Sequence, residues 1–199
     1  MKLNLGSGPT GINGWVNFDW GVLPLLSKMP PVRKILIGMG LLPRSYDAKW
    51  PNIQLVDIRK TLPLEDKSVD YVYCSHVLEH FEKKEVENIL KECLRVMKKK
   101  ALLRILLPDL KQLVEQYDGA DRFCREFYGY DKDTIGWTKM FIRGHEWMYD
   151  QKSFIDLLKQ VGFVECQLSK SKVSKMPDVE KLDLVVHEKL SMYIEARKG

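Results

Sequence analysis

The first twenty residues restrict the fold more than any other part of the chain. Residues 2–5 and 15–18 have the character of two short strands, and Gly-Ser-Gly-Pro-Thr-Gly at 6–11 forms the turn between them. Asp19 follows at the tip of the second strand. Glycines directly after a strand let a ligand lie against bare backbone, and an acid at the next strand tip can accept ribose hydroxyls. The stretch therefore indicates half of a site for an adenosine-type ligand.

The same glycines match the dinucleotide fingerprint G-x-G-x-x-G only in spacing. That fingerprint requires a helix that opens at the third glycine and an acid about 20 residues further on. Here Pro9 interrupts the turn, and Asp19 comes too early for a helix to fit. Without a helix N-terminus no pyrophosphate site is offered. A phosphate-free adenosine cofactor, commonly S-adenosylmethionine, fits better; an ordinary glycine turn is the alternative that this stretch leaves open.

Composition and charge narrow the class of protein. The length of 199 residues suits one domain with a full core, and the net charge is +5 with basic residues mostly interleaved with acids. That pattern argues against a nucleic-acid partner. The four cysteines form no C-x-x-C pair, so we expect a cytoplasmic protein with reduced thiols and no metal motif. No apolar run reaches the ~20 residues that cross a membrane.

Strands and helices alternate along the rest of the chain. Further strands are expected at 53–56, 69–74, 101–107, 163–168 and 190–196, and helices at 82–98, 108–117 and 151–161. Helical crossovers between strands predict a doubly wound, mostly parallel α/β sheet of seven strands. Ligands bind beyond the carboxyl ends of such strands. The residues that this arrangement brings to that edge are Gly6, Gly8, Asp19, Asp57, Ser75, His76 and Pro108.

An apolar, proline-punctuated insertion occupies about 21–50, at the tip of the second strand. Three interpretations stay open. It packs as ordinary core, it contacts a membrane surface weakly through one short apolar face and two cations, or it folds over the ligand as a lid. Among the two functional interpretations we favour the lid, because the segment leaves directly from Asp19 and Trp20.

At this point the sequence resembles class I S-adenosylmethionine-dependent methyltransferases over nearly its whole length, within a subgroup of small prokaryotic enzymes. Leu3–Gly8 is similar to the family's cofactor loop, Asp19 to its ribose-binding acid and Asp57 to the acid near adenine; the stretch 62–81, LPLEDKSVDYVYCSHVLEHF, is the most specific match. Asn4 departs from the family, which usually has an acid there. The resemblance implies a Rossmann-like, seven-stranded, single-domain fold over 1–199 whose last strand is antiparallel.

The resemblance also implies a site and a reaction. The residues expected to bind S-adenosylmethionine, and its product S-adenosylhomocysteine, are Asn4, Gly6, Ser7, Gly8, Asp19, Trp20, Asp57, Ile58, Ser75 and His76. The sulfonium methyl would pass to an O, N or C nucleophile of a small-molecule or glycan acceptor. The chain leaves the oligomeric state open. A non-catalytic cofactor-binding module and, less favoured, a nucleotide-cofactor oxidoreductase are the competing functions.

Histidines are the candidates for a general base, which helps when the nucleophile is a hydroxyl. We favour His145, on a loop after the aromatic-rich region, and retain His80 as the second catalytic candidate. His76 and His80 are four residues apart, a spacing that metal pairs also use, but no third ligand is evident in the sequence.

Overall fold

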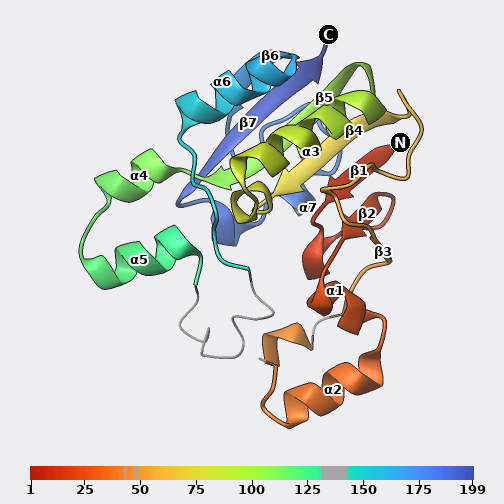
Figure 1. Ribbon diagram of the computed structural model, residues 1–199, viewed down its shortest axis with the longest axis vertical. Coiled ribbons are helices and arrows are strands. Elements are labelled where there is room, and N and C mark those ends of the chain that lie inside the picture. Colours follow the sequence, from red (N-terminus) through yellow and green to blue (C-terminus); the bar gives the residue numbers. More distant parts are fainter. Residues whose placement is uncertain (43, 48, 131–142) are drawn as a thin grey trace.

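The sheet of the computed structural model confirms the predicted fold (Figure 1). The structure describes residues 1–42, 44–47, 49–130 and 143–199, and within them seven strands pair in the order β3-β2-β1-β4-β5-β7-β6. β7 runs antiparallel to both β5 and β6, so the antiparallel last strand lies inside the sheet. The other pairs are parallel. The strands are β1 (Lys2–Leu5), β2 (Val16–Asp19), β3 (Ile53–Leu55), β4 (Val69–Ser75), β5 (Met97–Pro108), β6 (Phe163–Ser169) and β7 (Ser191–Lys198).

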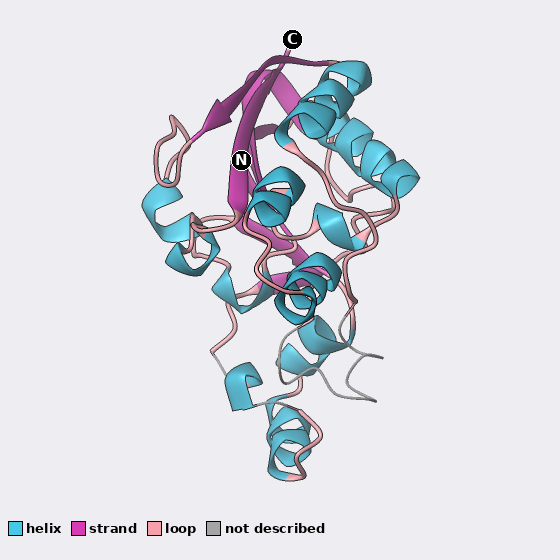
Figure 2. Ribbon diagram, turned by 90° about the vertical axis from the view of Figure 1, so that its left-hand side faces the viewer, coloured by secondary structure: helices cyan, strands magenta, loops and turns pink. Residues whose placement is uncertain are grey.

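Helices cover both faces of the sheet unequally (Figure 2). The α-helices are α1 (Val22–Ser27), α2 (Pro30–Gly38), α3 (Lys83–Val96), α4 (Leu110–Glu115), α5 (Ala120–Tyr128), α6 (Gln151–Val161) and α7 (Val179–Leu182). Short 3-10 turns are η1 (Gly8–Thr10), η2 (Arg44–Tyr46), η3 (Leu78–His80) and η5 (Val185–His187). α3 and α6 pack side by side on one face, with α6 against β6 and β7. On the opposite face the short α7 contributes Leu182, which packs with Tyr73 and Leu106 of the sheet.

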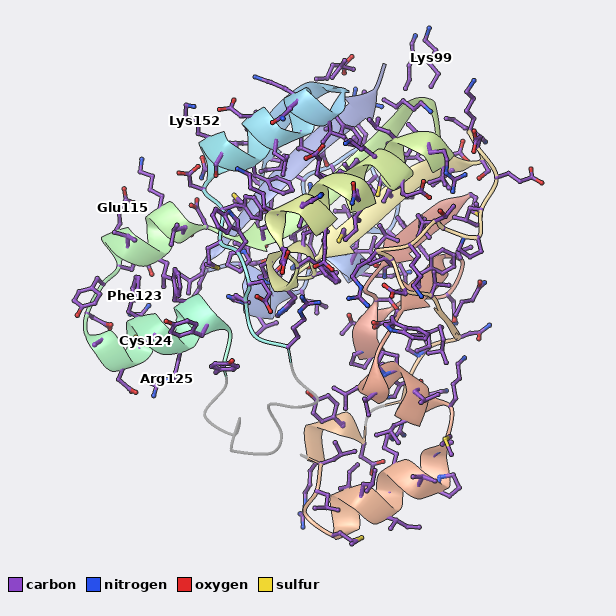
Figure 3. All side chains as sticks on the ribbon, viewed as in Figure 1. Lys99, Glu115, Phe123, Cys124, Arg125 and Lys152 are labelled. Atoms are coloured by element: carbon purple, nitrogen blue, oxygen red, sulfur yellow. The ribbon has the colours of Figure 1, made fainter. Side chains whose placement is uncertain are left out.

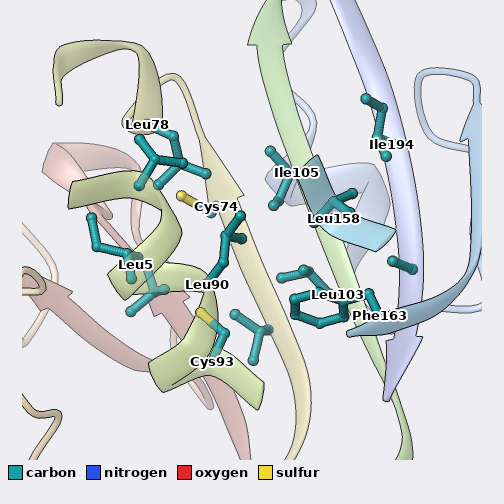
Figure 4. Packing of buried hydrophobic residues seen from close by; sticks show 14 of the residues in the cluster. Leu5, Cys74, Leu78, Leu90, Cys93, Leu103, Ile105, Leu158, Phe163 and Ile194 are labelled. Atoms are coloured by element: carbon teal, nitrogen blue, oxygen red, sulfur yellow. The ribbon is translucent and has the colours of Figure 1, made fainter. Parts of the chain in front are cut away.

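The main core lies between the sheet and the apolar faces of α3 and α6 (Figure 4). On α3 the buried side chains recur at helical spacing, with Ile89, Leu90 and Cys93 against Leu5 and Cys74 of the sheet. Both helices begin with a capping box, which satisfies two of the backbone N–H groups that a helix start leaves unpaired. The amphipathic pattern thus fixes which side of each helix faces the strands.

The opposite face is held by a smaller core and a buried ion cluster. The Arg104 guanidinium is fully buried; it donates to Glu195 at 2.8 Å and pairs with the buried carboxylate of Asp183. Tyr73 joins them by donating to the backbone oxygen of Leu182 on α7. A buried charge is tolerated when it is paired in this way. These bonds tie the connection between β6 and β7 to the sheet.

Two local features bear on the sequence predictions. β1 joins the parallel strand β2 through the single turn η1, so the helix that usually separates such strands is absent, as the spacing predicted.

The predicted helix end at 98 is wrong: α3 ends at Val96, and Lys98 to Lys100 belong to β5. The reason is that Met97 is completely buried and pairs with Val69 in the sheet, which pulls the chain into strand geometry.

The insertion at 21–50 projects from the body, with α2 at one extremity of the molecule (Figures 1 and 2). Pro43 and Ala48 lie outside the described residues. Among those that the structure describes there, Pro24, Arg33 and Leu42 are buried, whereas Ile35 and Met39 are 61% and 66% exposed. The segment therefore contributes little to the main core. No helix in the described part of the chain has both the length and the apolar character needed to cross a membrane.

Candidate functional site

The glycine turn is fixed to the next strand by backbone hydrogen bonds. The N–H groups of Gly6 and Ser7 donate to the carbonyl of Phe18 at 2.8 and 3.1 Å. Gly6 has φ +65°, and a Cβ there would lie 2.2 Å from a methyl carbon of Val77, so only glycine fits. Gly8 has φ +52° and open space within 4 Å of where its Cβ would be. The turn thus presents bare backbone to a ligand at Gly8.

Asp19 is held by the same turn. Its Oδ2 accepts from the N–H of Gly8 and its Oδ1 from the N–H of Trp20, both at 2.7 Å. Burial raises the pKa of Asp19, although the two backbone bonds oppose that shift. Two carboxylate oxygens offer about four lone-pair sites. The fixed carboxylate can therefore still accept hydrogen bonds from two neighbouring hydroxyls.

Asp57 follows β3 and is paired with Arg59. The guanidinium donates to both carboxylate oxygens at 2.8 Å. This bidentate contact lowers the pKa of Asp57 and keeps the carboxylate ionised. Ile58, between them, is 5% exposed. A ligand amino group that donates to the Asp57 carboxylate would share its oxygens with the Arg59 guanidinium.

A cleft of about 450 Å³, here called the glycine-loop cleft, gathers most of the predicted cofactor residues. Its predicted members are Gly6, Gly8, Asp19, Trp20, Asp57, Ile58, His76 and His80. Asn4, Ser7 and Ser75 do not line it. Asn4 is buried beneath the turn, where its side chain donates to Asn17 at 3.4 Å. The insertion also lines this cleft, through residues that the sequence did not single out: Gly21, Val22, Leu23, Pro24, Tyr46 and Trp50.

A second and larger cleft of about 910 Å³, the α5 cleft, lies beside it. Its residues come from the ends of β5 and β7, from α4 and α5, and from the loop at 143–147. They are His76, Pro108, Asp109, Leu113, Gln116, Arg122, Arg125, Glu126, Gly129, Tyr130, His145, Val186, Lys189, Leu190 and Ser191. Figure 3 labels Arg125 on α5 beside Phe123 and Cys124. Of all these residues, His76 alone also lines the glycine-loop cleft.

His76 therefore lies in the wall between the two clefts. Its backbone is in the left-handed region at φ +53°, a conformation that is uncommon for residues other than glycine and that recurs at functional sites. Its Nε2 is 2.8 Å from the Ser191 hydroxyl, and its Nδ1 is 3.2 Å from Oε1 of Glu79. Glu79 and Ser191 were missed by the sequence prediction; the available signal was the position of Glu79 between two histidines in His-Val-Leu-Glu-His.

His80 and His145 face each other with ring centroids 5.1 Å apart. His80 lines the glycine-loop cleft, and His145 lines the α5 cleft. Burial lowers the pKa of His145, so its imidazole is neutral at neutral pH and able to take a proton. The structure thus brings both predicted catalytic histidines to the boundary between the clefts, and their catalytic roles stay predictions.

Comparisons with known proteins find one matching family model and solved structures of the same fold. Residues 42–105 match the methyltransferase domain family. A SAM-dependent methyltransferase structure from Archaeoglobus fulgidus has 18% identity and a TM-score of 0.55, with coverage of 98% of this chain and 85% of that one. One from Methanosarcina mazei has 16% identity and a TM-score of 0.56, with 98% and 91% coverage. PigF, solved with S-adenosylhomocysteine, has 14% identity and a TM-score of 0.52, with 99% and 49% coverage. No curated protein sequence matches the chain.

Proposed function

We propose that the chain is a class I S-adenosylmethionine-dependent methyltransferase and that it methylates an oxygen, nitrogen or carbon atom of a small polar or glycan-type acceptor bound in the α5 cleft. The observation that carries the proposal is the meeting of two clefts at His76. A methyltransferase needs a cofactor site and an acceptor site in contact, and this pair of clefts supplies both.

The residues of the glycine-loop cleft fit the cofactor. The open side of Gly8 leaves room for a ligand against the backbone, and Asp19 presents a fixed carboxylate for ribose hydroxyls. Asp57 and Ile58 would meet the adenine from the next strand tip. The turn continues into the three-residue η1 instead of an α-helix, so no helix dipole is offered to a pyrophosphate. This favours a phosphate-free adenosine cofactor over a dinucleotide.

When bound, S-adenosylmethionine supplies a methyl group on a sulfonium that is already activated for transfer. The work left to the chain is to align the acceptor, exclude water and remove a proton where the nucleophile is a hydroxyl. His76 and His145 both line the α5 cleft and are placed to take that proton. The insertion residues Val22 and Leu23 cover the cofactor side.

The polar wall of the α5 cleft supports a polar acceptor. Arg122 and Arg125 on α5 face it together with Asp109 and Glu126. Arg122 is paired with Asp118 at 2.6 Å, and Arg125 forms an ion pair with Asp121. Mixed charges of this kind hydrogen-bond hydroxyl and amide groups without selecting one sign of charge. The large cleft leaves room for a sugar-sized acceptor.

Ligand binding tests the cofactor assignment. We expect S-adenosylhomocysteine to raise the melting temperature of the purified chain, and NAD to leave it unchanged. Asp19→Ala should lose roughly 1–3 kcal/mol of binding free energy, because the ribose hydroxyls lose their partner. Asp156→Ala, a surface acid of α6, is the control and should bind as wild type does. Stabilisation by NAD instead would favour the oxidoreductase alternative.

Turnover tests the catalytic part. Labelled cofactor is incubated with panels of small polar and glycan acceptors, and transfer of label is measured. We expect label on at least one acceptor class, and less label from Asp19→Ala than from wild type at a cofactor concentration that does not saturate the variant. Tight S-adenosylhomocysteine binding without transfer to any acceptor would favour the non-catalytic binding module.

A further inference from the structure

We propose that Glu79, His80 and His145 form a binding site for one divalent metal ion of the zinc class. One ligating atom from each of the three residues lies within 4.8 Å of the other two. Two imidazoles and a carboxylate are a donor set of zinc sites that keep a position open for another ligand. In the sequence, His76 and His80 had the spacing of a metal pair, but no third ligand was evident. The fold brings Glu79 and His145 close to His80.

Glu79 carries the strongest argument, because its carboxylate is buried without adequate partners. The residue is 1% exposed, and within the described part of the chain neither carboxylate oxygen has a hydrogen-bond donor. The Nδ1 atom of His76 is 3.2 Å from Oε1, at ion-pair distance but without hydrogen-bond geometry. An ionised carboxylate in such a place needs a compensating positive charge. A bound cation provides one.

The two histidines are oriented as metal ligands are. The Nδ1 atom of His80 is 3.1 Å from the carbonyl of Gly144, and that of His145 is 3.0 Å from the carbonyl of Phe127. A carbonyl only accepts, so each Nδ1 carries the proton and each Nε2 keeps its lone pair. Metal-ligating histidines almost always donate their other N–H to such an oxygen.

Gly129 keeps this lone pair of His145 accessible. A Cβ at Gly129 would lie 2.4 Å from Nε2 of His145 and would cover it. Gly129 also has φ +66° as the C-cap of α5, a conformation that suits glycine. The same residue thus ends the helix and leaves the nitrogen open.

Backbone bonds hold the two ligand-bearing segments together. The N–H groups of Glu146 and Trp147 donate to the carbonyl of Glu79 at 2.8 and 3.2 Å, and that of His145 donates to Tyr128 at 2.9 Å. Ligand distances of ~2.0–2.2 Å around zinc place tetrahedral donor atoms about 3.4 Å apart. Small rotations of the half-buried histidine side chains would bring the three donor atoms from within 4.8 Å of one another to this separation.

The position of the ion gives it a chemical use that rests on the proposed function. His80 belongs to the glycine-loop cleft and His145 to the α5 cleft, so the ion would lie between cofactor and acceptor. Its open position can hold an acceptor oxygen or nitrogen and lower the pKa of that group. With Nε2 of His145 bound to the ion, His145 would assist proton removal through the ion instead of as a free base. Metal binding itself does not depend on methyl transfer and is measured separately.

The experiment uses the full chain after dialysis against a chelator, titrated with Co²⁺ and followed by calorimetry and visible absorption. We expect one Co²⁺ per chain, with absorption bands of a four-coordinate nitrogen–oxygen site that Zn²⁺ displaces. His80→Gln and His145→Gln should each weaken binding by at least ~10–100-fold. Glu79→Gln should do the same if it folds. Circular dichroism shows that each variant is folded; cofactor affinity is not used for this purpose, because His80 lines the glycine-loop cleft.

Two control variants should keep wild-type metal affinity. Glu87→Gln changes a surface acid of α3 that pairs with Lys91, and Cys124→Ser removes an exposed thiol. The proposal is overturned if the wild-type chain shows no stoichiometric Co²⁺ binding, or if both histidine variants bind as tightly as wild type. Loss of binding in Cys124→Ser alone would also overturn it. Each of these outcomes would leave the methyltransferase proposal unaffected.

Discussion

The glycine-loop cleft and the α5 cleft share one edge of the sheet but are built in different ways. Gly6, Asp19 and Asp57 follow three adjacent strands, and backbone N–H groups fix the Asp19 carboxylate. The α5 cleft instead joins a helix, a loop and the start of β7, which are far apart in the sequence. One cleft therefore depends on local backbone geometry, and the other on how distant segments pack. Under the proposed function, the glycine-loop cleft binds the cofactor and the α5 cleft binds the acceptor.

Replacing the insertion is expected to have the largest effect among the changes that distinguish the roles of the two clefts. We expect a chain with 24–42 replaced by a short polar linker to fold and to bind S-adenosylhomocysteine, yet to lose measurable methyl transfer. The reason is that the segment adds few buried residues but covers the glycine-loop cleft. Circular dichroism, calorimetry and labelled turnover give the three readouts.

The outcomes of that replacement distinguish the three interpretations of the insertion. Loss of folding would show that it is core, against the lid. Sedimentation with anionic vesicles that the replacement abolishes would favour membrane contact, which the exposed Ile35 and Met39 beside Lys34 make worth measuring. Unchanged turnover would exclude the lid.

His145→Ala is expected to affect only the acceptor side. The residue lines the α5 cleft and not the glycine-loop cleft, so turnover should fall about 10²–10⁴-fold, the usual contribution of a general base. Affinity for S-adenosylhomocysteine should stay at the wild-type value in calorimetry. Full turnover with a true acceptor would show that His145 is structural, and weakened cofactor binding would contradict the separation of the clefts.

The same contrast explains which parts of the site follow from the sequence alone. Strand tips follow from local periodicity, and parallel strands place those tips at one edge, so Gly6, Asp19 and Asp57 could be predicted from the order of residues. The proximity of Glu79 to His145 could not be predicted, because it depends on hydrogen bonds from the loop at 143–147 back to η3. The prediction for the end of α3 was wrong for a related reason. Burial of Met97 in the sheet outweighed the preference of lysines for the end of a helix.

Two glycines of one turn should respond differently to alanine. At Gly6 the new Cβ would clash with Val77 at 2.2 Å, so Gly6→Ala should destabilise the fold by roughly 1–3 kcal/mol from overpacking, in addition to ~1–2 kcal/mol for its positive φ. At Gly8 only the second cost applies, because open space surrounds its Cβ position. Gly8→Ala should therefore remain the more stable variant in denaturant unfolding but lose cofactor affinity. Equal stability of the two would contradict the packing described for Gly6.

The smallest expected effect is a pH dependence confined to the cofactor side. Burial raises the pKa of Asp19, whereas Arg59 lowers that of Asp57. As pH falls, Asp19 should begin to protonate above the usual aspartate range and lose its ability to accept from ribose hydroxyls. Affinity for S-adenosylhomocysteine should then fall in wild type, but not in Asp19→Asn, measured by calorimetry at each pH.

The free energy of unfolding should change in the opposite direction to the cofactor affinity as pH falls. Measuring both therefore tests whether Asp19 is the group that titrates. A carboxyl whose pKa is raised in the folded state binds its proton more tightly there than in the unfolded chain. The contribution of Asp19 to stability is therefore full below its unfolded pKa and is lost as pH rises through the folded pKa. In denaturant unfolding without ligand, the wild-type chain should gain stability relative to Asp19→Asn as pH falls. A parallel loss of affinity and relative stability would mean that acid disturbs the whole glycine-loop cleft, and that Asp19 is not the titrating group.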